Sequence, residues 1–551
     1  MKNKRTIAAV LSAVLAAGAL LSGCGNTPAP DSGNGSPSSE NGNLSADASL
    51  ENAAFGDPAL PLTEEKETLK VWVRNDVTML DACGGDPNNT PFFQELEKRT
   101  NVHIEWIIPA SGTEQEQFNL QMSAGTLPDI MYTYPGQVFY PDGLDAAVDD
   151  GYFLDLTELL PKYAPNYLAA VAESSEDTKR GVKTDAGRNV LIYSIFQKEQ
   201  PPFYGYVVRQ DWLDELGLDA PVTYDDWEAM LTAFKTNYNA AAPLSINTAF
   251  FWNLGVGMGV YAPTDFYQVD GKVRQAFLDD PEAVREFLTL MNKWYDAGLI
   301  DPDFASSSSF WGDPVLITNN NTGAFLTMYT LPTSTFLPAM EAGAAFSAVP
   351  TPVKNAGDTL QYGAPVPSTN AAYAVTTDCK NPELAIRWID YLFSPEGSML
   401  ANYGVEGETY TIDSDGTPVF TELISDNPDG LNYDAAMRTY LLAPSFPVTY
   451  YDWERELQFV PEDDFAMCYT WDKASYDTYY STYASLTVEE NSEYANIFAD
   501  ISTYISENSL SFITGAKSLD EFDSFVETLK GMGLERCAKL KQAALDRYNS
   551  R

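Results

Sequence analysis

The stretch from residue 68 to residue 132 alternates between strand-like and helix-like sequence, and this alternation allows few folds. Apolar and polar residues alternate in segments that indicate strands: 68–74, 102–108 and 129–132. A helix beginning at Pro91 separates the first two segments, and a capping box, Thr113-x-x-Glu116, begins a helix between the second and third. Strand, helix, strand, helix, strand predicts a parallel sheet flanked by helices, and therefore an α/β fold.

Polar side chains follow the first and third of these strands. Arg74 and Asp76 come directly after the first strand, and Tyr134 follows the third. Ligands of parallel sheets bind outside the carboxyl ends of the strands. We therefore expect these three residues at a ligand-binding rim, although a surface ion pair would also explain Arg74 and Asp76.

The later sequence continues in the same style and becomes helical towards its end. Capping residues and apolar stripes predict helices that begin after Thr223 and Asp280, and capping boxes at Thr487 and Ser518 predict helices in the last hundred residues. Asp-Gly pairs at 270–271 and 415–416 predict hairpin turns. A chain of 551 residues has room for two or three domain-sized units.

The N-terminus has the anatomy of an export signal. Lys2, Lys4 and Arg5 precede an apolar run over residues 7–21, which is shorter than the roughly 20 apolar residues that a membrane-spanning helix needs. The run ends in Leu-Ser-Gly-Cys, which resembles the lipobox of bacterial lipoproteins. The resemblance implies a signal peptide over 1–23 and a lipid on Cys24, and the polar composition that follows predicts a flexible tether over 24–66.

Charge and cysteine use exclude several classes of function. With 33 basic and 78 acidic residues the formal net charge is −45, which disfavours nucleic-acid binding. The single histidine, His103, excludes histidine-rich metal sites, and we expect no cofactor and no metal. Four further cysteines lie far apart in the sequence and leave both disulfides and free thiols open: Cys83, Cys379, Cys468 and Cys537.

Seven blocks, in order along the chain, carry a family resemblance: FFQELEKRT (92–100), GTLPDI (125–130), YVVRQDWL (206–213), WYDAGLIDPDF (294–304), WIDYLFSPEGS (388–398), YGVEG (403–407) and QAALDRY (542–548). With these blocks the chain resembles the extracellular solute-binding proteins of bacterial ABC importers. More narrowly it is similar to the LplA-type lipoproteins of Gram-positive bacteria, within the group of maltose-binding protein.

The resemblance implies a two-lobe periplasmic-binding-protein-like fold of type II, each lobe a sheet flanked by helices, with a helical C-terminal part. It places the N-lobe at 67–204 and 366–440 and the C-lobe at 205–365 and 441–551, with chain crossings near 204–209 and 362–367. It further implies a monomer, without enzymatic activity, on the outer face of the cytoplasmic membrane. This monomer would close on an oligosaccharide and deliver it to the permease subunits of an importer.

The resemblance also adds ligand-binding candidates to Arg74, Asp76 and Tyr134. They lie after the first crossing, in places where related sugar binders have cleft aromatics, or in loops after strands: Arg209, Trp252, Trp311, Tyr329 and Glu406. Aromatic faces suit sugar rings, but packing within a lobe would equally explain each aromatic residue. An ion pair with Asp211 would explain Arg209.

Some relatives, including alginate-binding proteins, carry a calcium loop before a Pro-Leu-Ser strand. Here that place holds Ala240, Ala241 and Ala242, which supply no side-chain oxygen, so we predict no calcium there. Two other functions remain open on the sequence alone. A secreted glycoside hydrolase would need paired carboxylates, which 78 acidic residues supply by chance without any selecting motif. A peptide-binding or sensor lipoprotein would share the same N-terminus.

Overall fold

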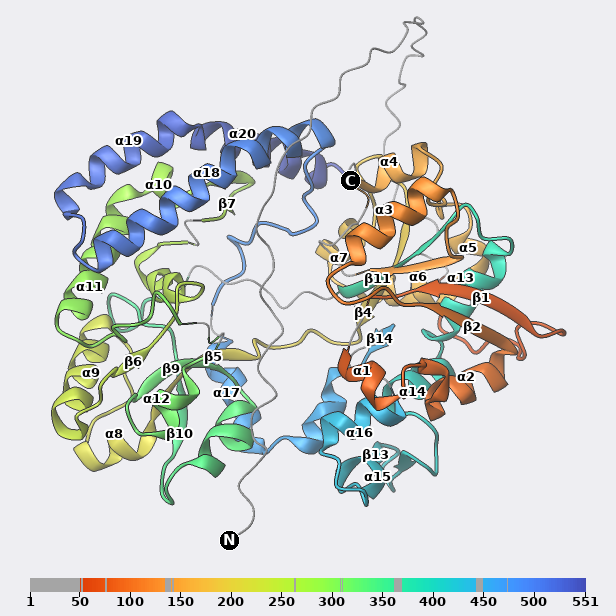
Figure 1. Cartoon of the computed structure of the whole chain (residues 1–551), viewed down its shortest axis with the longest axis horizontal. Helices are drawn as coiled ribbons and strands as arrows, with labels where there is room; N and C mark the ends of the chain where they lie inside the picture. Colours follow the sequence, from red (N-terminus) through yellow and green to blue (C-terminus); the bar gives the residue numbers. More distant parts are fainter. Residues whose placement is uncertain are drawn as a thin grey trace, which may run out of the picture.

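The computed structural model describes residues 50, 53–74, 77–133, 140, 143–261, 264–307, 309, 311–360, 369–441, 449–472 and 474–551. These residues form two lobes, each built around its own sheet (Figure 1). Several predicted features lie outside the described residues: the signal over 1–23, Cys24, Asp76, Tyr134 and the crossing at 362–367.

The first lobe contains a six-stranded sheet in the order β14-β4-β11-β3-β1-β2. The strands are β1 (Glu67–Trp72), β2 (Val102–Ile107), β3 (Ile130–Thr133), β4 (Leu191–Phe196), β11 (Thr369–Val375) and β14 (Tyr450–Tyr451). β1 pairs in parallel with β2 and β3, which confirms the sheet predicted from the alternation, whereas β11 runs antiparallel to β3 and β4. β14 lies beyond the predicted lobe boundary at residue 440 and nevertheless belongs to this sheet.

The second lobe contains a four-stranded sheet in the order β10-β5-β9-β6. Its strands are β5 (Tyr204–Arg209), β6 (Leu244–Ser245), β9 (Ala324–Met328) and β10 (Phe346–Val349). β5 runs antiparallel to both neighbours, and β6 runs parallel to β9. Two hairpins stand apart from the sheets: β7 (Tyr267–Val269) with β8 (Lys272–Arg274), and β12 (Tyr410–Ile412) with β13 (Pro418–Phe420). Their turns contain the predicted Asp-Gly pairs.

Helices cover the faces of both sheets (Figure 1). Around the first sheet lie α1 (Val77–Ala82), α2 (Pro91–Thr100), α3 (Glu114–Ala124), α4 (Gly143–Asp149), α5 (Leu160–Tyr163), α6 (Pro165–Glu173), α7 (Glu176–Gly181), α13 (Pro382–Tyr391), α14 (Pro395–Tyr403), α15 (Glu422–Ser425) and α16 (Tyr433–Tyr440). With the second sheet lie α8 (Gln210–Leu216), α9 (Tyr224–Tyr238), α10 (Ala276–Asp279), α11 (Pro281–Asp296), α12 (Pro314–Thr318), α17 (Glu462–Trp471), α18 (Val488–Ile513), α19 (Phe522–Met532) and α20 (Leu534–Asn549).

The predicted helix starts have mixed outcomes. Thr223 and Thr487 form complete capping boxes at α9 and α18, and Asp280 caps α11. Thr113 precedes α3 but makes no capping bond; its backbone, with φ −111° and ψ 9°, lies outside the extended region that capping residues typically adopt. Ser518 caps a short 3₁₀ turn, Leu519–Glu521, in place of the predicted box.

The predicted tether ends earlier than residue 66, because the chain is already packed on the first lobe from Phe55. The Phe55 ring stacks on Tyr450 at 5.2 Å, and the Gly56 amide donates to Asn166 Oδ1 at 2.7 Å. Leu62 is buried in the first-lobe core. These contacts offset the conformational entropy that a polar, glycine-rich composition would otherwise retain.

Two described segments cross between the lobes and are bonded to each other. Residues 197–203 lead from β4 into β5, and residues 452–461 lead from β14 to α17, which packs on β5 and β10. Trp453 Nε1 donates to the carbonyl of Lys198 at 3.2 Å, and Lys198 pairs with Glu454. The crossings therefore act as one connection.

The four cysteines beyond Cys24 are buried free thiols, which settles the alternative that the sequence left open. Burial raises the pKa of Cys379 and of Cys468 to about 12, so these thiols are protonated and inert near neutral pH. In the described part of the chain, no helix has both the length and the apolar character needed to span a bilayer.

A buried carboxylate ties α13 to α6. Asp390, on α13, is 5% exposed and accepts from the Tyr167 amide at 2.8 Å and from Asn166 Nδ2 at 2.9 Å. It therefore acts as an N-terminal cap for α6, supplied by another helix. Burial raises the pKa of Asp390 to about 6, and the two hydrogen bonds only partly oppose that rise.

We predict that Asp390→Asn changes how stability depends on pH. A carboxyl group whose pKa is higher in the folded state stabilises fully below the unfolded value, about 4, and loses this contribution as the pH rises through about 6. The melting temperature of the variant minus that of the native protein should therefore rise between pH 4 and pH 7. The corresponding change in the difference between their free energies of unfolding is about 2–3 kcal/mol. Thermal denaturation across this range measures it, and a flat difference would contradict the assignment.

Candidate site at the facing sheet edges

The strand pairing determines which edges of the two sheets adjoin. β1, β3, β4 and β14 run in one direction, so their carboxyl ends share one edge of the first sheet. The chain leaves this edge after Phe196 and enters the second sheet at Tyr204. Tyr204 pairs with Met328 at the end of β9. The end of β4 and the start of β5 are therefore joined directly by the first crossing.

Three aromatic residues cluster at this edge of the second sheet, and we call them the aromatic platform: Tyr204, Phe250 and Trp311. The rings of Phe250 and Trp311 are nearly parallel, with centroids 6.1 Å apart and an interplanar angle of 10°. The Tyr204 ring lies 5.7 Å from Trp311 and 6.0 Å from Phe250. All three side chains are half-buried, so the platform keeps exposed aromatic surface. Such surface can pack against the apolar face of a sugar ring.

Local backbone contacts fix the platform. The Gly312 amide donates to the carbonyl of Leu326 at 2.9 Å, and a Cβ at Gly312 would lie 2.6 Å from the Cβ of Phe325. Only glycine permits this approach, which sets Trp311 beside the end of β9. Asn247 accepts from the Phe250 amide at 3.2 Å and donates to the Ser309 carbonyl at 2.8 Å. It thereby ties the Phe250 loop to the Trp311 segment.

The first-lobe side of the crossing carries a second pair of rings. Phe196 and Tyr451 are register partners at the ends of β4 and β14, and their rings meet edge-on at 5.1 Å. The guanidinium of buried Arg455 lies 4.9 Å from the Tyr451 ring and donates to the carbonyl of Asn402 at 2.8 Å. Cation–π contact of this kind holds the Tyr451 ring in place.

Arg209 lies at the opposite end of β5 from the platform. It is 4% exposed, and its guanidinium donates to Asp211 at 2.8 and 2.6 Å and stacks on Trp212 at 4.4 Å. Burial opposes ionisation of Asp211, but the hydrogen bonds from Arg209 outweigh it and lower the pKa of that carboxyl. The structure thus places Arg209 in the ion pair that the sequence offered as its alternative.

The structure brings Trp311 to the sheet edge but packs two other aromatic candidates into cores. Trp252 is 7% exposed, with its ring 4.4 Å from Phe251 and 5.5 Å from Phe287. Tyr329 is also 7% exposed and meets Phe465 at 6.0 Å, although its amide bonds to Phe203 at the crossing.

The remaining candidates belong to the first lobe. Arg74 is exposed just after β1, at the shared carboxyl edge of that sheet. Glu406 is exposed beside the β12–β13 hairpin, where its backbone bridges to Tyr410. Asp76 and Tyr134 lie outside the described residues. Of the predicted residues that the structure describes, Trp311 alone contributes to the aromatic platform.

Sequence reasoning missed Tyr204 and Phe250. The run Phe250-Phe251-Trp252 stood out as aromatic, but composition gives no sign of which ring faces the sheet edge. Tyr204 is the residue at which the chain enters β5, and the sequence indicates it only as part of the crossing near 204–209. The signal that could have found both is the position of aromatic residues directly beside predicted strand ends.

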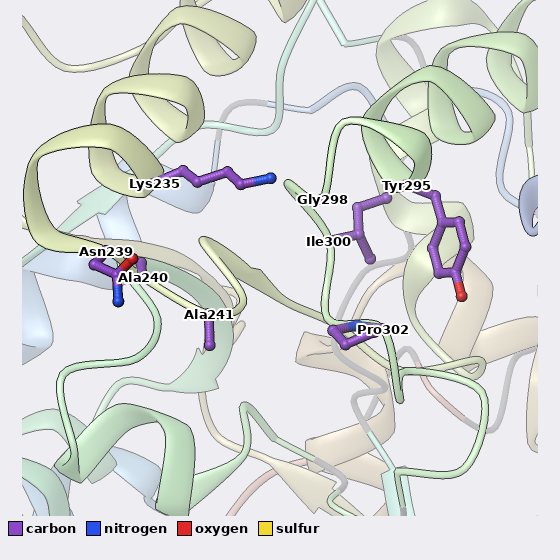
Figure 2. A pocket seen from close by; sticks show the side chains of 8 residues that line it. All are labelled: Lys235, Asn239, Ala240, Ala241, Tyr295, Gly298, Ile300 and Pro302. Atoms are coloured by element: carbon purple, nitrogen blue, oxygen red, sulfur yellow. The ribbon is translucent and has the colours of Figure 1, made fainter.

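A surface cavity of about 460 Å³ lies elsewhere in the second lobe, between the ends of α9 and α11 (Figure 2). Its lining residues are Lys235, Asn239, Ala240, Ala241, Tyr295, Gly298, Ile300 and Pro302. Lys235 extends from α9 towards Gly298 and donates to the carbonyl of Ala297 at the end of α11. An ammonium group there complements the negative end of the α11 dipole.

Comparison with known proteins defines the class. The family model described as bacterial extracellular solute-binding protein matches residues 88–399, and the chain belongs to this family. The chain is similar to the fructooligosaccharide ABC transporter substrate-binding protein FusA of Streptococcus pneumoniae, with 25% identity over 553 residues that cover 93% of this chain and 95% of FusA.

Solved structures agree on the fold. An HMO-binding, ABC-transporter-associated solute-binding protein from Bifidobacterium longum infantis has a TM-score of 0.68 and 20% identity, covering 88% of this chain and 99% of its own. The alginate-binding protein AlgQ2, in a structure without calcium ion, has a TM-score of 0.64, 24% identity and the same coverage. The predicted two-lobe α/β fold is therefore confirmed.

The residues at the place where some relatives carry a calcium loop do not fit a calcium ion. The loop between α9 and β6 spans residues 239–243, and its only side-chain oxygen belongs to exposed Asn239. A calcium ion takes six to eight oxygen ligands, and here the ammonium of Lys235 lies against the neighbouring helix end. Within the described ranges, no group of three or more His, Cys, Asp or Glu residues is arranged to hold a metal.

We predict that neither millimolar calcium nor EDTA shifts the melting temperature of the mature protein. A ligand that binds only the folded state would raise its stability in proportion to occupancy. Differential scanning calorimetry with added calcium, with EDTA and with magnesium as the control cation measures this. A calcium-specific rise of several degrees would contradict the expectation.

Proposed function

We propose that this protein captures an oligosaccharide between its two lobes and delivers it to the membrane subunits of an ABC importer. The observation that carries the proposal is the aromatic platform of Tyr204, Phe250 and Trp311 at the sheet edge beside the first crossing. FusA, which covers nearly the same length, is a fructooligosaccharide-binding protein of such a transporter and supports the ligand class.

The two-lobe architecture supplies a mechanism for capture. The lobes are joined through segments 197–203 and 452–461, which both start beside the Phe196–Tyr451 pair. Segment 197–203 ends at the platform residue Tyr204. A sugar that contacts both edges stabilises the closed arrangement and shifts the population towards it. Closure also removes water from the aromatic faces, which strengthens the contact.

We predict that Trp311→Ala weakens oligosaccharide binding at least tenfold. Truncation of a buried aromatic contact costs about 2 kcal/mol, and each 1.4 kcal/mol is tenfold in affinity. Calorimetry of the soluble domain measures the affinity for fructooligosaccharides, for other plant and host oligosaccharides, and for peptides. Tyr295→Ala, a half-buried aromatic of the same lobe outside the platform, is the matched control and should bind normally. Peptide binding without any sugar binding would overturn the ligand class.

The protein acts by binding, without chemistry on its ligand. The relatives named above are binding proteins, which supports this reading over a glycoside hydrolase. Prolonged incubation with each bound oligosaccharide, followed by chromatography, should return the ligand intact. Released product would instead support the hydrolase.

We also propose that Cys24 is lipidated and anchors a monomer to the outer face of a Gram-positive cytoplasmic membrane. The lipobox-like Leu21-Ser22-Gly23-Cys24 and the polar stretch that follows support this arrangement. More than one acyl chain is needed for a stable anchor, as in a diacylated cysteine.

We predict that Cys24→Ser releases the protein into the growth medium. The native protein should sediment with membranes and shift to the detergent phase on Triton X-114 partition, whereas the variant should not. Mass spectrometry of the mature N-terminus provides the direct readout. An unlipidated Cys24 in the native protein would remove the anchor from the proposal.

A further inference from the structure

The C-terminal helix α20 joins the two lobes by side-chain contacts, away from the two described crossing segments. Helices α18, α19 and α20 pack together, and α18 packs on α11 of the second lobe. The end of α20 reaches the first lobe, where Figure 1 shows the C-terminus beside α4. We call the side chains of this contact the C-terminal latch: Asp177, Asp185, Arg547, Tyr548 and Arg551.

Two arginines from the α20 end converge on one first-lobe carboxylate. Arg547 Nε lies 3.0 Å from Asp185 Oδ2, and Arg551 Nε and Nη2 lie 2.9 and 2.7 Å from Asp185 Oδ1. Arg551 also donates through Nη1 to the carbonyl of Lys183 at 2.8 Å. The side chain of Arg551 is 4% exposed, so these bonds are shielded from water.

Tyr548 makes the second half of the latch. Its hydroxyl bonds to the Asp177 carboxylate on α7 and donates to the Asp177 carbonyl at 3.1 Å. Its ring contacts the guanidinium groups of Arg180, at 5.3 Å, and Arg551, at 5.2 Å. Arg180 belongs to the first lobe and Arg551 to the C-terminal end of the chain, so the ring is a shared contact between the lobes.

The segment that leads into α18 reinforces the same contact. The Tyr483 ring lies on α7, where a Cβ at Gly181 would come within 2.4 Å of it, and the Tyr483 hydroxyl bonds to Thr369 at the start of β11. Arg547 also pairs with Glu490 on α18 at 2.9 Å. The latch therefore extends from the first lobe into the C-terminal helices of the second.

We propose that the C-terminal latch is a pivot that restricts the relative motion of the lobes to closure about one axis; this inference rests on the proposed capture function. The two described crossings and the latch are separate attachments, and a rotation about the line through them preserves both. Motion about any other axis would break the latch. Without the latch the unliganded lobes would also separate about other axes, and the fraction ready to close would fall.

Asp185→Asn tests the pivot, because it removes the charge that both arginines share without adding bulk. We expect a larger radius of gyration by small-angle X-ray scattering of the unliganded protein, and about three- to tenfold weaker oligosaccharide binding. The effect arises away from the platform residues, so the ligand-bound scattering curve should match the native one. Scattering needs no ligand, so it decides on the latch even if no sugar binds and the proposed function fails.

Arg536→Gln is the matched control, because it removes an ion pair with Glu493 at 2.7 Å that lies wholly within the C-terminal helices. Its scattering and affinity should equal those of the native protein. If Asp185→Asn does not fold, Arg551→Gln tests the same contact from the other lobe. Unchanged scattering in the folded latch variants would overturn the proposal.

Discussion

The parallel pairing of β1 with β2 and β3 is the constraint on which the site depends. Parallel strands gather their carboxyl ends at one edge, and β4 and β14 add theirs because β11 runs antiparallel between β3 and β4. The chain then leaves this edge after Phe196 and enters β5 at Tyr204. If β4 ran antiparallel to β3, the end of β4 would lie at the opposite edge of the sheet, away from the ends of β1 and β3. Here the geometry of the first sheet determines where the second lobe can attach.

Local signals made much of this fold predictable. The alternation over residues 68–132 specified the parallel strands, and Thr223 and Thr487 specified two helix starts through side-chain capping. Thr113 shows the limit of such signals: its backbone, with φ −111° and ψ 9°, is not extended, so a sequence match did not give a capping box. The backbone angles of the residue before a helix depend on the preceding loop, which the match does not specify.

The site was less predictable because its contacts join residues far apart in sequence. Trp311 was named, but its partners Tyr204 and Phe250 are set by the approach of Gly312 to β9 and by the side chain of Asn247. Trp252 had the stronger composition signal and lies in the core. Periodicity identifies a buried face of a helix or strand, whereas Trp311 lies outside helices and strands, and Tyr204 and Phe250 lie at element ends, where too few residues remain to define a period.

The net negative charge of the chain bears on both the latch and lobe closure. Acidic residues exceed basic ones by 45 and are spread along the chain, so both lobes carry negative surfaces that repel at short range. Arginines of the α20 end meet first-lobe carboxylates at the latch, where attraction is local and shielded from salt by the burial of Arg551. Repulsion across the remaining facing surfaces opposes closure without a ligand. In the proposed mechanism, a ligand that binds both edges adds the attraction that closure otherwise lacks.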